Sequence, residues 1–550
     1  MSALDLSATP FELTDAQCQW VTDTLAAMTD EEKAGQLFCV MGGDYPIEDL
    51  KRMTERGLVG GVLYRPVRPA SEIQADFEIL DSVSKIPLLH AANLEEGGSG
   101  GASDGTLFGW PMLTAATDDP AWAETFGALC ASEGTMAGIN WTFSPVSDLD
   151  LNYLNPITNV RTFGSDLKRV KAMTAAYVRA VQSRGIAACA KHFPGDGVDY
   201  RDHHLHPTVN SLPAEKWYST YGEVYKNLIA AGLMSVMVGH IAQPNVARDI
   251  CPGLSTEEAL LPGSLSRTLL TGVLRERLGF NGLITTDATI MGGYTQPQRR
   301  CEAIPASVMA GCDMLVFTTD LVEDYGYILK ALADGRLTHE RLDEAVARIL
   351  ALKAKVCFEK HHIEPVDGPA LHRACADKAI TLVKSTYPSA LPMTPERYPN
   401  IRLITLGKDN ILDGSIGEIT RSYLIKQGFT VERYDPFTDN LHGTAELPQN
   451  RLTLYLANYE QASNQTVVRI NWCPKHALDM PRFVHDETSI FVSLANPYCL
   501  QDVPRVQTYI NAYTATRDTI ELSIDKLMGK STFTGSSPVD AFCGLPDTKL

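Results

Sequence analysis

Short apolar runs alternate with longer amphipathic stretches over the first part of the chain. Each run has the length and composition of a buried strand, and several end in polar or charged residues. The pattern predicts helices between the runs, for example at residues 121–137, 167–184 and 267–278. It predicts strands at residues 37–40, 60–64, 88–94, 141–146, 186–192, 235–241, 282–286 and 313–318.

This succession of strand–helix units indicates an α/β fold, a (β/α)8 barrel of the TIM type. An open doubly wound sheet is the structural rival, but no G-x-G-x-x-G motif follows an early strand. We expect residues 1–358 to form this catalytic domain. Because barrel enzymes build their sites at the carboxyl ends of the strands, the polar residues there are the first candidates for chemistry.

A second α/β pattern begins near residue 389. It predicts strands at residues 402–405, 430–434, 452–457 and 489–494, separated by intervals of helical length. We expect a smaller three-layer α/β sandwich domain over residues 389–550, joined to the barrel by a linker over residues 359–388. The loops of this second domain contain no recognisable catalytic constellation.

The charge and the cysteines narrow the class of protein. The formal net charge of −18 argues against a nucleic-acid or anionic-membrane partner. The chain begins without a basic and apolar leader, and its 12 cysteines include no C-x-x-C pair. We therefore expect a cytoplasmic enzyme with reduced thiols, no metal and no cofactor. Assembly into a homodimer is compatible with the sequence.

Chemistry-bearing residues concentrate in residues 191–207. Lys191 and His192 end the fifth predicted strand, and a kink is needed for both side chains to face one site, because neighbours on a strand point to opposite faces. Asp202 stands two positions before His204, and such a carboxylate can accept one ring N–H and orient the other ring nitrogen. His203 and His206 compete for the same role.

Asp287 closes the seventh predicted strand, at the end of the run Gly-Phe-Asn-Gly-Leu-Ile-Thr-Thr-Asp. A carboxylate at that place can act as a nucleophile, as a base or as a metal ligand. The alternative is an Asp that only caps the helix that follows.

These motifs together resemble family 3 glycoside hydrolases, and more narrowly their bacterial β-N-acetylglucosaminidase branch. The resemblance is carried by Lys-His-Phe-Pro-Gly at 191–195, Asp-His-His at 202–204 and the segment that ends at Asp287. Supporting matches are Asp-Glu-Glu-Lys-Ala-Gly-Gln-Leu at 30–37, Asn-Val-Arg-Thr-Phe-Gly-Ser-Asp at 159–166, Val-Gly-His at 238–240 and Pro-Gly-Ser-Leu-Ser-Arg at 262–267.

The resemblance implies a role for each matched residue. Asp287 is the nucleophile, and His204 is the acid and then the base, steered by Asp202. The residues implied in binding the sugar are Asn93, Glu95, Asp150, Arg161, Lys191, His192, His240 and Met291.

The chain departs from the family pattern at three places. The usual Lys-His-Phe-Pro-Gly-His-Gly carries Asp196 here, and the usual Asp-Ser-His carries His203 in its middle. Asn93 stands where the family commonly has the Asp of Asp-x-Glu-Gly-Gly, and an extra Glu96 follows. These changes bear on the identity of the sugar more than on the reaction type.

The function expected from the resemblance is that of a retaining exo-β-N-acetylhexosaminidase. It would remove terminal β-linked amino sugars, N-acetylglucosamine first, through a covalent glycosyl-enzyme. The enzymatic alternatives are a β-glucosidase or β-xylosidase of the same fold, and a β-N-acetylglucosaminide phosphorylase, since a neutral histidine does not repel phosphate as a carboxylate would. From another class, an inactive sugar-binding protein would require loss of Asp287 or His204, and both are present.

Overall fold

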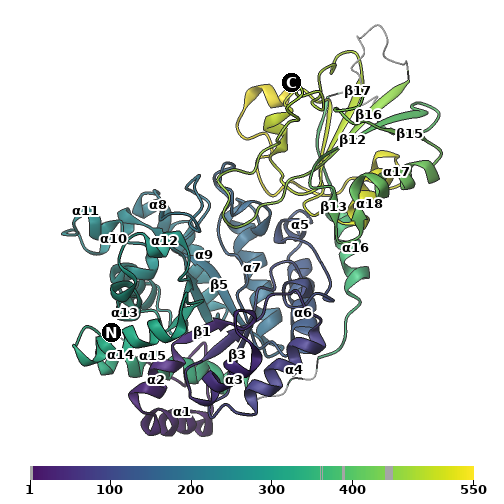
Figure 1. Cartoon of the computed structure of the whole chain (residues 1–550). Helices are drawn as coiled ribbons and strands as arrows, with labels where there is room; N and C mark the ends of the chain where they lie inside the picture. Colours follow the sequence, from purple (N-terminus) through teal and green to yellow (C-terminus); the bar gives the residue numbers. More distant parts are fainter. Residues whose placement is uncertain (1–3, 359–360, 362, 387–390, 440–449) are drawn as a thin grey trace. The chain divides into compact units, whose positions relative to one another are not determined.

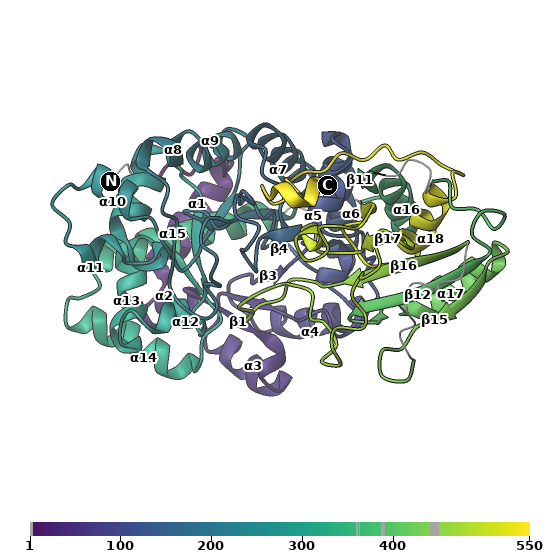
Figure 2. The same cartoon turned by 90° about the horizontal axis from the view of Figure 1, so that it is seen from above.

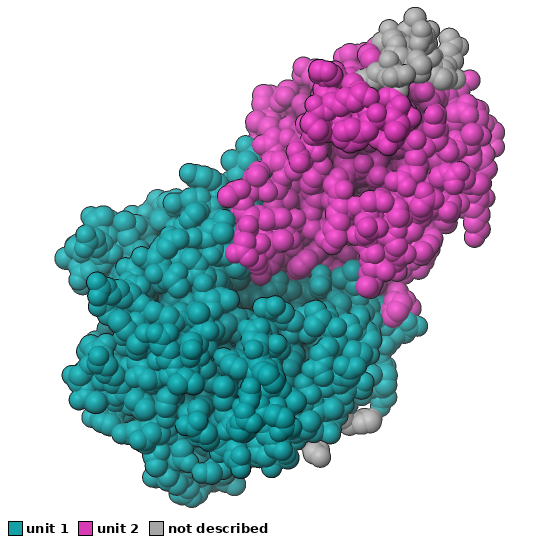
Figure 3. All heavy atoms as spheres, viewed as in Figure 1, with its two compact units in different colours: residues 1–108, 123–158, 167–368 teal, residues 109–122, 159–166, 369–550 magenta. Residues whose placement is uncertain are grey.

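The computed structural model describes residues 4–358, 361, 363–386, 391–439 and 450–550. The chain divides into two compact units, which Figure 3 colours separately. Unit 1 comprises residues 1–108, 123–158 and 167–368, and unit 2 comprises residues 109–122, 159–166 and 369–550. The main division thus falls about ten residues after the expected end of the barrel, and two short segments from the first part of the chain belong to unit 2.

Eight parallel strands close a barrel in unit 1, which confirms the predicted fold (Figure 1). Around the barrel each strand pairs with the next along the chain, and the last pairs with the first. The strands are β1 (Phe38–Met41), β2 (Gly61–Leu63), β3 (Leu89–Ala92), β4 (Trp141–Thr142), β5 (Ala187–Phe193), β7 (Ser235–Val238), β9 (Leu283–Ala288) and β10 (Met314–Val316).

Helices follow the strands of unit 1 (Figure 2). In α7 (Leu167–Gln182) the buried residues include Val170, Met173, Tyr177 and Val181, at the spacing of one helical face. The main helices are α1 (Asp15–Ala27), α2 (Asp30–Gln36), α3 (Ile47–Glu55), α4 (Ala70–Asp81), α6 (Pro120–Met136), α9 (Tyr221–Ala230), α13 (Arg300–Ala310), α14 (Leu321–Ala333) and α15 (His339–Val356). The helix expected at 267–278 is instead a π-helix, η5 (Thr268–Arg277).

The loop after β5 is held against the barrel by close backbone contacts. The register of β5 with β7 shifts between Ala190 and Phe193, which supplies the expected kink. Gly197 has a φ of +94°, and a Cβ there would lie 2.0 Å from the carbonyl oxygen of Leu149. Only glycine fits such a position, and the close approach brings the polar loop over the carboxyl ends of the strands.

Unit 2 contains a six-stranded mixed sheet, consistent with the expected α/β class. Its order is β11 (Thr381–Ser385), β18 (Thr508–Asn511), β17 (Thr488–Ser493), β16 (Arg451–Asn458), β12 (Asn400–Gly407) and β15 (Thr430–Arg433), and only β11 runs antiparallel to its neighbour. The helices α16 (Gly368–Ala379), α17 (Ile416–Lys426) and α18 (Arg517–Leu527) accompany it.

Two elements of unit 2 occupy the expected linker. Both α16 and β11 fall within residues 359–388, and β11 forms an edge of the sheet. Residues 359, 360, 362 and 387–388 of that linker lie outside the described residues. One apolar cluster of the sheet includes Ile404, Tyr455 and Phe491, together with Ile470 and with Leu500 of the 3-10 helix η8 (Cys499–Asp502).

Among the described residues, no helix combines the length and the apolar character needed to cross a membrane.

Candidate active site

The candidate residues of unit 1 gather at the carboxyl ends of the barrel strands. Asn93 and Glu95 follow β3, Lys191 and His192 lie within β5, and Asp287 lies near the end of β9. Asp202, His203 and His204 come from the loop after β5. The strand ends of a parallel barrel meet at one rim, so residues far apart in sequence form one site there.

Asp287 lies between two imidazole rings. Its Oδ2 atom is 3.9 Å from Nε2 of His192 and 3.9 Å from Nε2 of His203. Its Oδ1 atom accepts a hydrogen bond from the backbone N–H of Ala288. Burial works to raise the pKa of Asp287, but the surrounding histidines, His203 first, hold that pKa well below its usual value. The carboxylate is therefore ionised and available as a nucleophile. We call His192, His203, His204 and Asp287 the histidine cluster.

His204 and Asp202 form the pair that the sequence predicted. Nδ1 of His204 lies 2.7 Å from Oδ1 of Asp202, and the backbone N–H of His204 donates to the same oxygen. The side chain of Asp202 is fully buried, whereas that of His204 is 18% exposed. The carboxylate thus engages Nδ1–H and leaves Nε2 as the ring atom available to a substrate. The backbone N–H of Gly292 donates to the carbonyl of His204 and holds the loop.

Lys191 is held by the two residues that follow β3. Its Nζ atom forms an ion pair with Glu95 and donates a hydrogen bond of 3.1 Å to Oδ1 of Asn93. Lys191 is only 3% exposed. Lys191 is thus in direct contact with two other predicted binding residues, Asn93 and Glu95.

His192 is fixed by Asp148. Nδ1 of His192 lies 2.7 Å from Oδ2 of Asp148. The backbone N–H of His192 donates to both oxygens of Asp148, and that of Asp196 donates to Oδ1. The contact with Asp148 leaves Nε2 of His192 on the side of Asp287, 3.9 Å from its Oδ2. Spacing along the chain does not predict this contact between Asp148 and His192, so it is a finding of the structure.

His240 contacts the backbone next to Asp287. The residue is fully buried, its Nδ1 lies 2.9 Å from Oγ of Ser264, and its Nε2 lies 3.1 Å from the carbonyl oxygen of Ala288. Burial lowers the pKa of His240 to about 4. Since both ring nitrogens are engaged by the protein, this geometry favours a positioning role over the sugar contact expected from the sequence.

The structure shows protein contacts or positions in the fold for the other three expected binding residues. Asp150 is buried and its Oδ1 accepts the hydroxyl of Thr158 at 2.7 Å. Met291 is buried at the start of the short helix α12 (Gly292–Thr295), and its backbone N–H donates to Ala288. Arg161 ends the short helix η3 (Asn159–Arg161), which belongs to unit 2. The sugar contacts of these three residues remain predictions.

Three ligand-type atoms of the histidine cluster lie close enough together to raise the question of a metal. Nε2 of His192, Nε2 of His203 and a carboxylate oxygen of Asp287 lie within 4.8 Å of one another. However, Nδ1 of His203 accepts the backbone N–H of His240 at 3.4 Å, so in the neutral ring Nε2 carries the proton. A protonated nitrogen is not a metal ligand, and the arrangement therefore fits a metal poorly.

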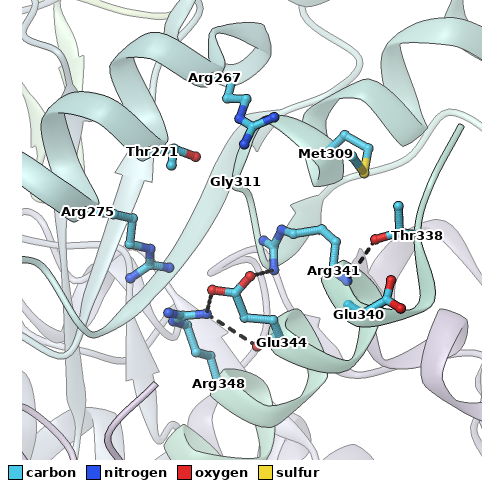
Figure 4. A pocket seen from close by; sticks show the side chains of 10 residues that line it. All are labelled: Arg267, Thr271, Arg275, Met309, Gly311, Thr338, Glu340, Arg341, Glu344 and Arg348. Carbon is cyan, nitrogen blue, oxygen red and sulfur yellow. Dashed lines mark hydrogen bonds and ion pairs between the residues drawn. The ribbon is translucent and has the colours of Figure 1, made fainter. Parts of the chain in front are cut away.

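A second charged cluster lies elsewhere in unit 1, around a cavity of about 240 Å³ (Figure 4). Asp313, just before β10, pairs with Arg275 at 2.7 Å and with Arg341 at 2.8 Å. Glu344 pairs with Arg348 at 2.7 Å and lies 3.5 Å from Arg341. We call these five residues the arginine cluster. It lies at the amino end of β10, whereas the predicted site residues lie at the carboxyl ends of the strands.

Comparisons with known proteins identify the family and similar structures. Residues 29–352 match the model of the glycosyl hydrolase family 3 N-terminal domain. A protein of Cellulomonas fimi named β-N-acetylglucosaminidase/β-glucosidase is 44% identical over 567 aligned residues, covering 100% of both chains. A solved structure of the β-glucoside phosphorylase BglX, bound to 2FGlc, superposes with a TM-score of 0.92 at 43% identity and covers 98% of this chain and 99% of its own. A family 3 β-N-acetylglucosaminidase from Paenibacillus sp. str. FPU-7 shares the fold, with a TM-score of 0.76 and 22% identity over 94% of this chain and 99% of that one.

Proposed function

This chain belongs to glycosyl hydrolase family 3, and on that premise we propose that it cleaves terminal β-linked gluco-configured sugars with retention of configuration. Asp287 is the proposed nucleophile, His204 the acid and Asp202 the partner that orients His204. The observation that carries the proposal is the contact of 2.7 Å between Nδ1 of His204 and the buried Asp202, on the same barrel rim as the ionised Asp287.

The first step forms a covalent intermediate. A carboxylate oxygen of Asp287 attacks the anomeric carbon while protonated His204 gives its Nε2 proton to the departing oxygen. The aglycone leaves as a neutral alcohol, and the sugar is left bound to Asp287 as an ester. The charge of Asp202 stabilises the imidazolium before the transfer and keeps the neutral ring in place after it.

We propose that N-acetylglucosamine and glucose are both accepted. The Cellulomonas fimi relative is named for both activities, and it aligns along the whole chain. Lys191, Asn93 and Glu95 supply a charged and hydrogen-bonding group for the sugar hydroxyls. β-Linked N-acetylgalactosamine, galactose and xylose are the comparison sugars.

The acceptor that releases the sugar distinguishes two candidate functions, a glycosidase and a phosphorylase. After the first step His204 is neutral, whereas a carboxylate acid/base would be an anion. A neutral ring does not repel phosphate, so we favour phosphate over water as the acceptor. The BglX structure, named as a β-glucoside phosphorylase, adds support because it is similar over nearly the whole chain. Hydrolysis, the outcome expected from sequence, is the other candidate.

One experiment tests the reaction and the acceptor together. Nitrophenyl β-glycosides of the five sugars are incubated with and without inorganic phosphate, and the sugar products are identified by NMR. We expect cleavage of the glucosaminide and the glucoside, a faster rate with phosphate, and a sugar 1-phosphate that retains the β configuration, because two inversions give retention. Free sugar alone would assign hydrolysis, and no cleavage of either sugar would refute the proposal.

A further inference from the structure

The two unusual residues of the loop after β5 face each other. Asp196 and His203 stand where the family pattern has His and Ser, and Oδ2 of Asp196 lies 3.7 Å from Nε2 of His203. Both side chains are buried, and neither atom has a hydrogen-bond partner among the described residues. A buried polar atom without a hydrogen-bond partner reduces the stability of the fold. Here two such atoms, Oδ2 of Asp196 and Nε2 of His203, face each other, which calls for an explanation.

The protonation of the His203 ring follows from its surroundings. Its Nδ1 accepts the backbone N–H of His240, which places the proton of the neutral ring on Nε2. Burial, and then the charge of His204, lower the pKa of His203 well below its usual value, so the ring is neutral. The Nε2–H group therefore stands between two acceptors, Oδ2 of Asp196 at 3.7 Å and Oδ2 of Asp287 at 3.9 Å.

We propose that His203 is a positioning residue for the nucleophile, donating its Nε2 proton to Oδ2 of Asp287, and that Asp196 is the competing acceptor for that proton. The proposal rests on the proposed function in that it takes Asp287 as the nucleophile. A small rotation of the ring shortens either contact to hydrogen-bond length. A donor on Oδ2 fixes the orientation of the carboxylate so that its other oxygen is presented to the anomeric carbon, and loss of the donor therefore slows attack whatever the leaving group.

The state of Asp196 decides which acceptor receives the proton. Burial, and then the charge of Asp148, raise the pKa of Asp196 to about 8. Its Oδ1 accepts from Asn155 and from the backbone N–H of Gly197, and Asp202 contributes a further negative charge nearby. Below that pH Asp196 is neutral, and the Nε2–H group of His203 donates its hydrogen bond to Asp287. Above it, ionised Asp196 attracts the proton and adds negative charge beside Asp287.

The first test isolates the attack step. The rate at which a 2-deoxy-2-fluoro-β-glucosyl fluoride inactivates the enzyme is measured together with kcat/KM for aryl and alkyl glycosides. We expect His203→Ala to lose about 10- to 100-fold in both, by a similar factor on every leaving group, because a hydrogen bond to a charged group is lost. His203→Gln, which keeps an N–H donor, should recover part of the loss. His206→Ala is the matched control.

The second test uses pH. With a dinitrophenyl glycoside, whose departure needs no acid, the kcat/KM of the wild type should fall above about pH 8, and Asp196→Asn should lack that fall. A His203→Ala variant within about threefold of wild type, or a loss confined to poor leaving groups, would overturn the role of His203. An unchanged alkaline limb in Asp196→Asn would overturn that of Asp196. Labelling of a residue other than Asp287 in the wild type would instead refute the proposed function. If His203→Ala does not fold, His203→Gln and Asp196→Asn still decide.

Discussion

The barrel unit holds two buried groups of ionisable side chains, and they differ in how their charges are paired. In the arginine cluster each carboxylate lies within 2.8 Å of a guanidinium nitrogen, and Arg341 also donates to the carbonyls of Val308 and Cys312. In the histidine cluster Oδ2 of Asp287 has two imidazole nitrogens at 3.9 Å, beyond hydrogen-bond length. In the first cluster the carboxylates are paired with guanidinium groups, and in the second Oδ2 of Asp287 is not paired at hydrogen-bond length.

The difference separates a structural role from a chemical one. A buried charge whose partner is removed destabilises the fold, so the arginine cluster stabilises the barrel only while it is complete. Burial, and then the charge of Arg348, lower the pKa of Arg275 to about 9, which shows how closely the cations of that cluster depend on Asp313 and Glu344. In the histidine cluster the pKa of Asp287 is held well below its usual value, so that carboxylate is ionised. Substitutions in the first should therefore reduce stability, and those in the second should reduce turnover.

The largest effect is expected for Asp287→Ala. Removing the nucleophile should lower kcat by at least about 10⁴-fold on every substrate. The melting temperature should stay within about 3 °C of wild type, the change that roughly 1 kcal/mol produces, because the side-chain nitrogens of His192 and His203 lie 3.9 Å from Oδ2 of Asp287 in the free enzyme. Steady-state kinetics and calorimetry on the same preparation check both. A variant that keeps more than about a tenth of wild-type turnover would remove Asp287 from this role.

His204→Ala should reduce activity by an amount that depends on the leaving group of the substrate. Cleavage of alkyl glycosides or disaccharides should fall by about 10²- to 10⁴-fold, while dinitrophenyl glycosides lose much less, since a good leaving group departs without a proton. The glycosyl-enzyme should then accumulate in water, so KM falls together with kcat. Phosphate, already an anion, should restore turnover without a base.

Asp202→Ala should give a milder form of the same pattern, because the ring remains but loses its orientation. The measurement is kcat/KM across leaving groups of graded pKa, with His206→Ala as the control. An equal loss on all leaving groups would mean that the acid is another residue. It would also be the pattern expected for His203, so the two variants are to be measured side by side.

Asp313→Asn tests the other side of the comparison. It leaves Arg275 and Arg341 buried without the carboxylate that they share, which should cost about 3–5 kcal/mol in the free energy of unfolding. The kcat of the folded fraction should not change. Chemical denaturation with activity measured below the transition checks this. The matched control is Asp334→Asn, whose partner Arg336 is exposed and which should be close to wild type. A loss of kcat without a loss of stability would contradict the division between the clusters.

Much of the fold could be predicted because each barrel strand is a short apolar run followed by polar residues. The run that ends at Asp287 and the Asp202–His204 spacing also located the core of the candidate site. The shortest strand, β4, has only two residues in the structure, although the apolar run around it was visible. In unit 2 the edge pair β11 and β18 was missed, because one lay in the expected linker and the other, Thr508–Asn511, is a run of only four residues.

Contacts that depend on how loops return to the barrel could not be predicted. His203 looked like a competitor of His204, and only the folded loop shows its Nε2 turned toward Asp196 and Asp287. The assignment of residues 159–166 to unit 2, which takes Arg161 with it, likewise has no signature in local periodicity. Spacing along the chain identifies residues with the right chemistry, but it does not say which of them face one another across strands.

The smallest effect is expected at Asn93, which contacts Lys191 and is also predicted to bind the sugar. Its Oδ1 accepts from Lys191 at 3.1 Å, while its amide nitrogen has no hydrogen bond among the described residues and can donate to a sugar. A carboxylate would accept there instead of donating, and would compete with Glu95 for Lys191. We therefore expect Asn93→Asp to change the ratio of kcat/KM between gluco and galacto substrates by about two- to tenfold, the size of one hydrogen bond, with stricter preference for gluco. Aryl β-glycosides of N-acetylglucosamine and N-acetylgalactosamine give the ratio directly. Asn227→Asp, on the outer helix α9, is the matched control for the added charge. An unchanged ratio would show that Asn93 serves only to hold Lys191, and would place it with the structural contacts of the barrel.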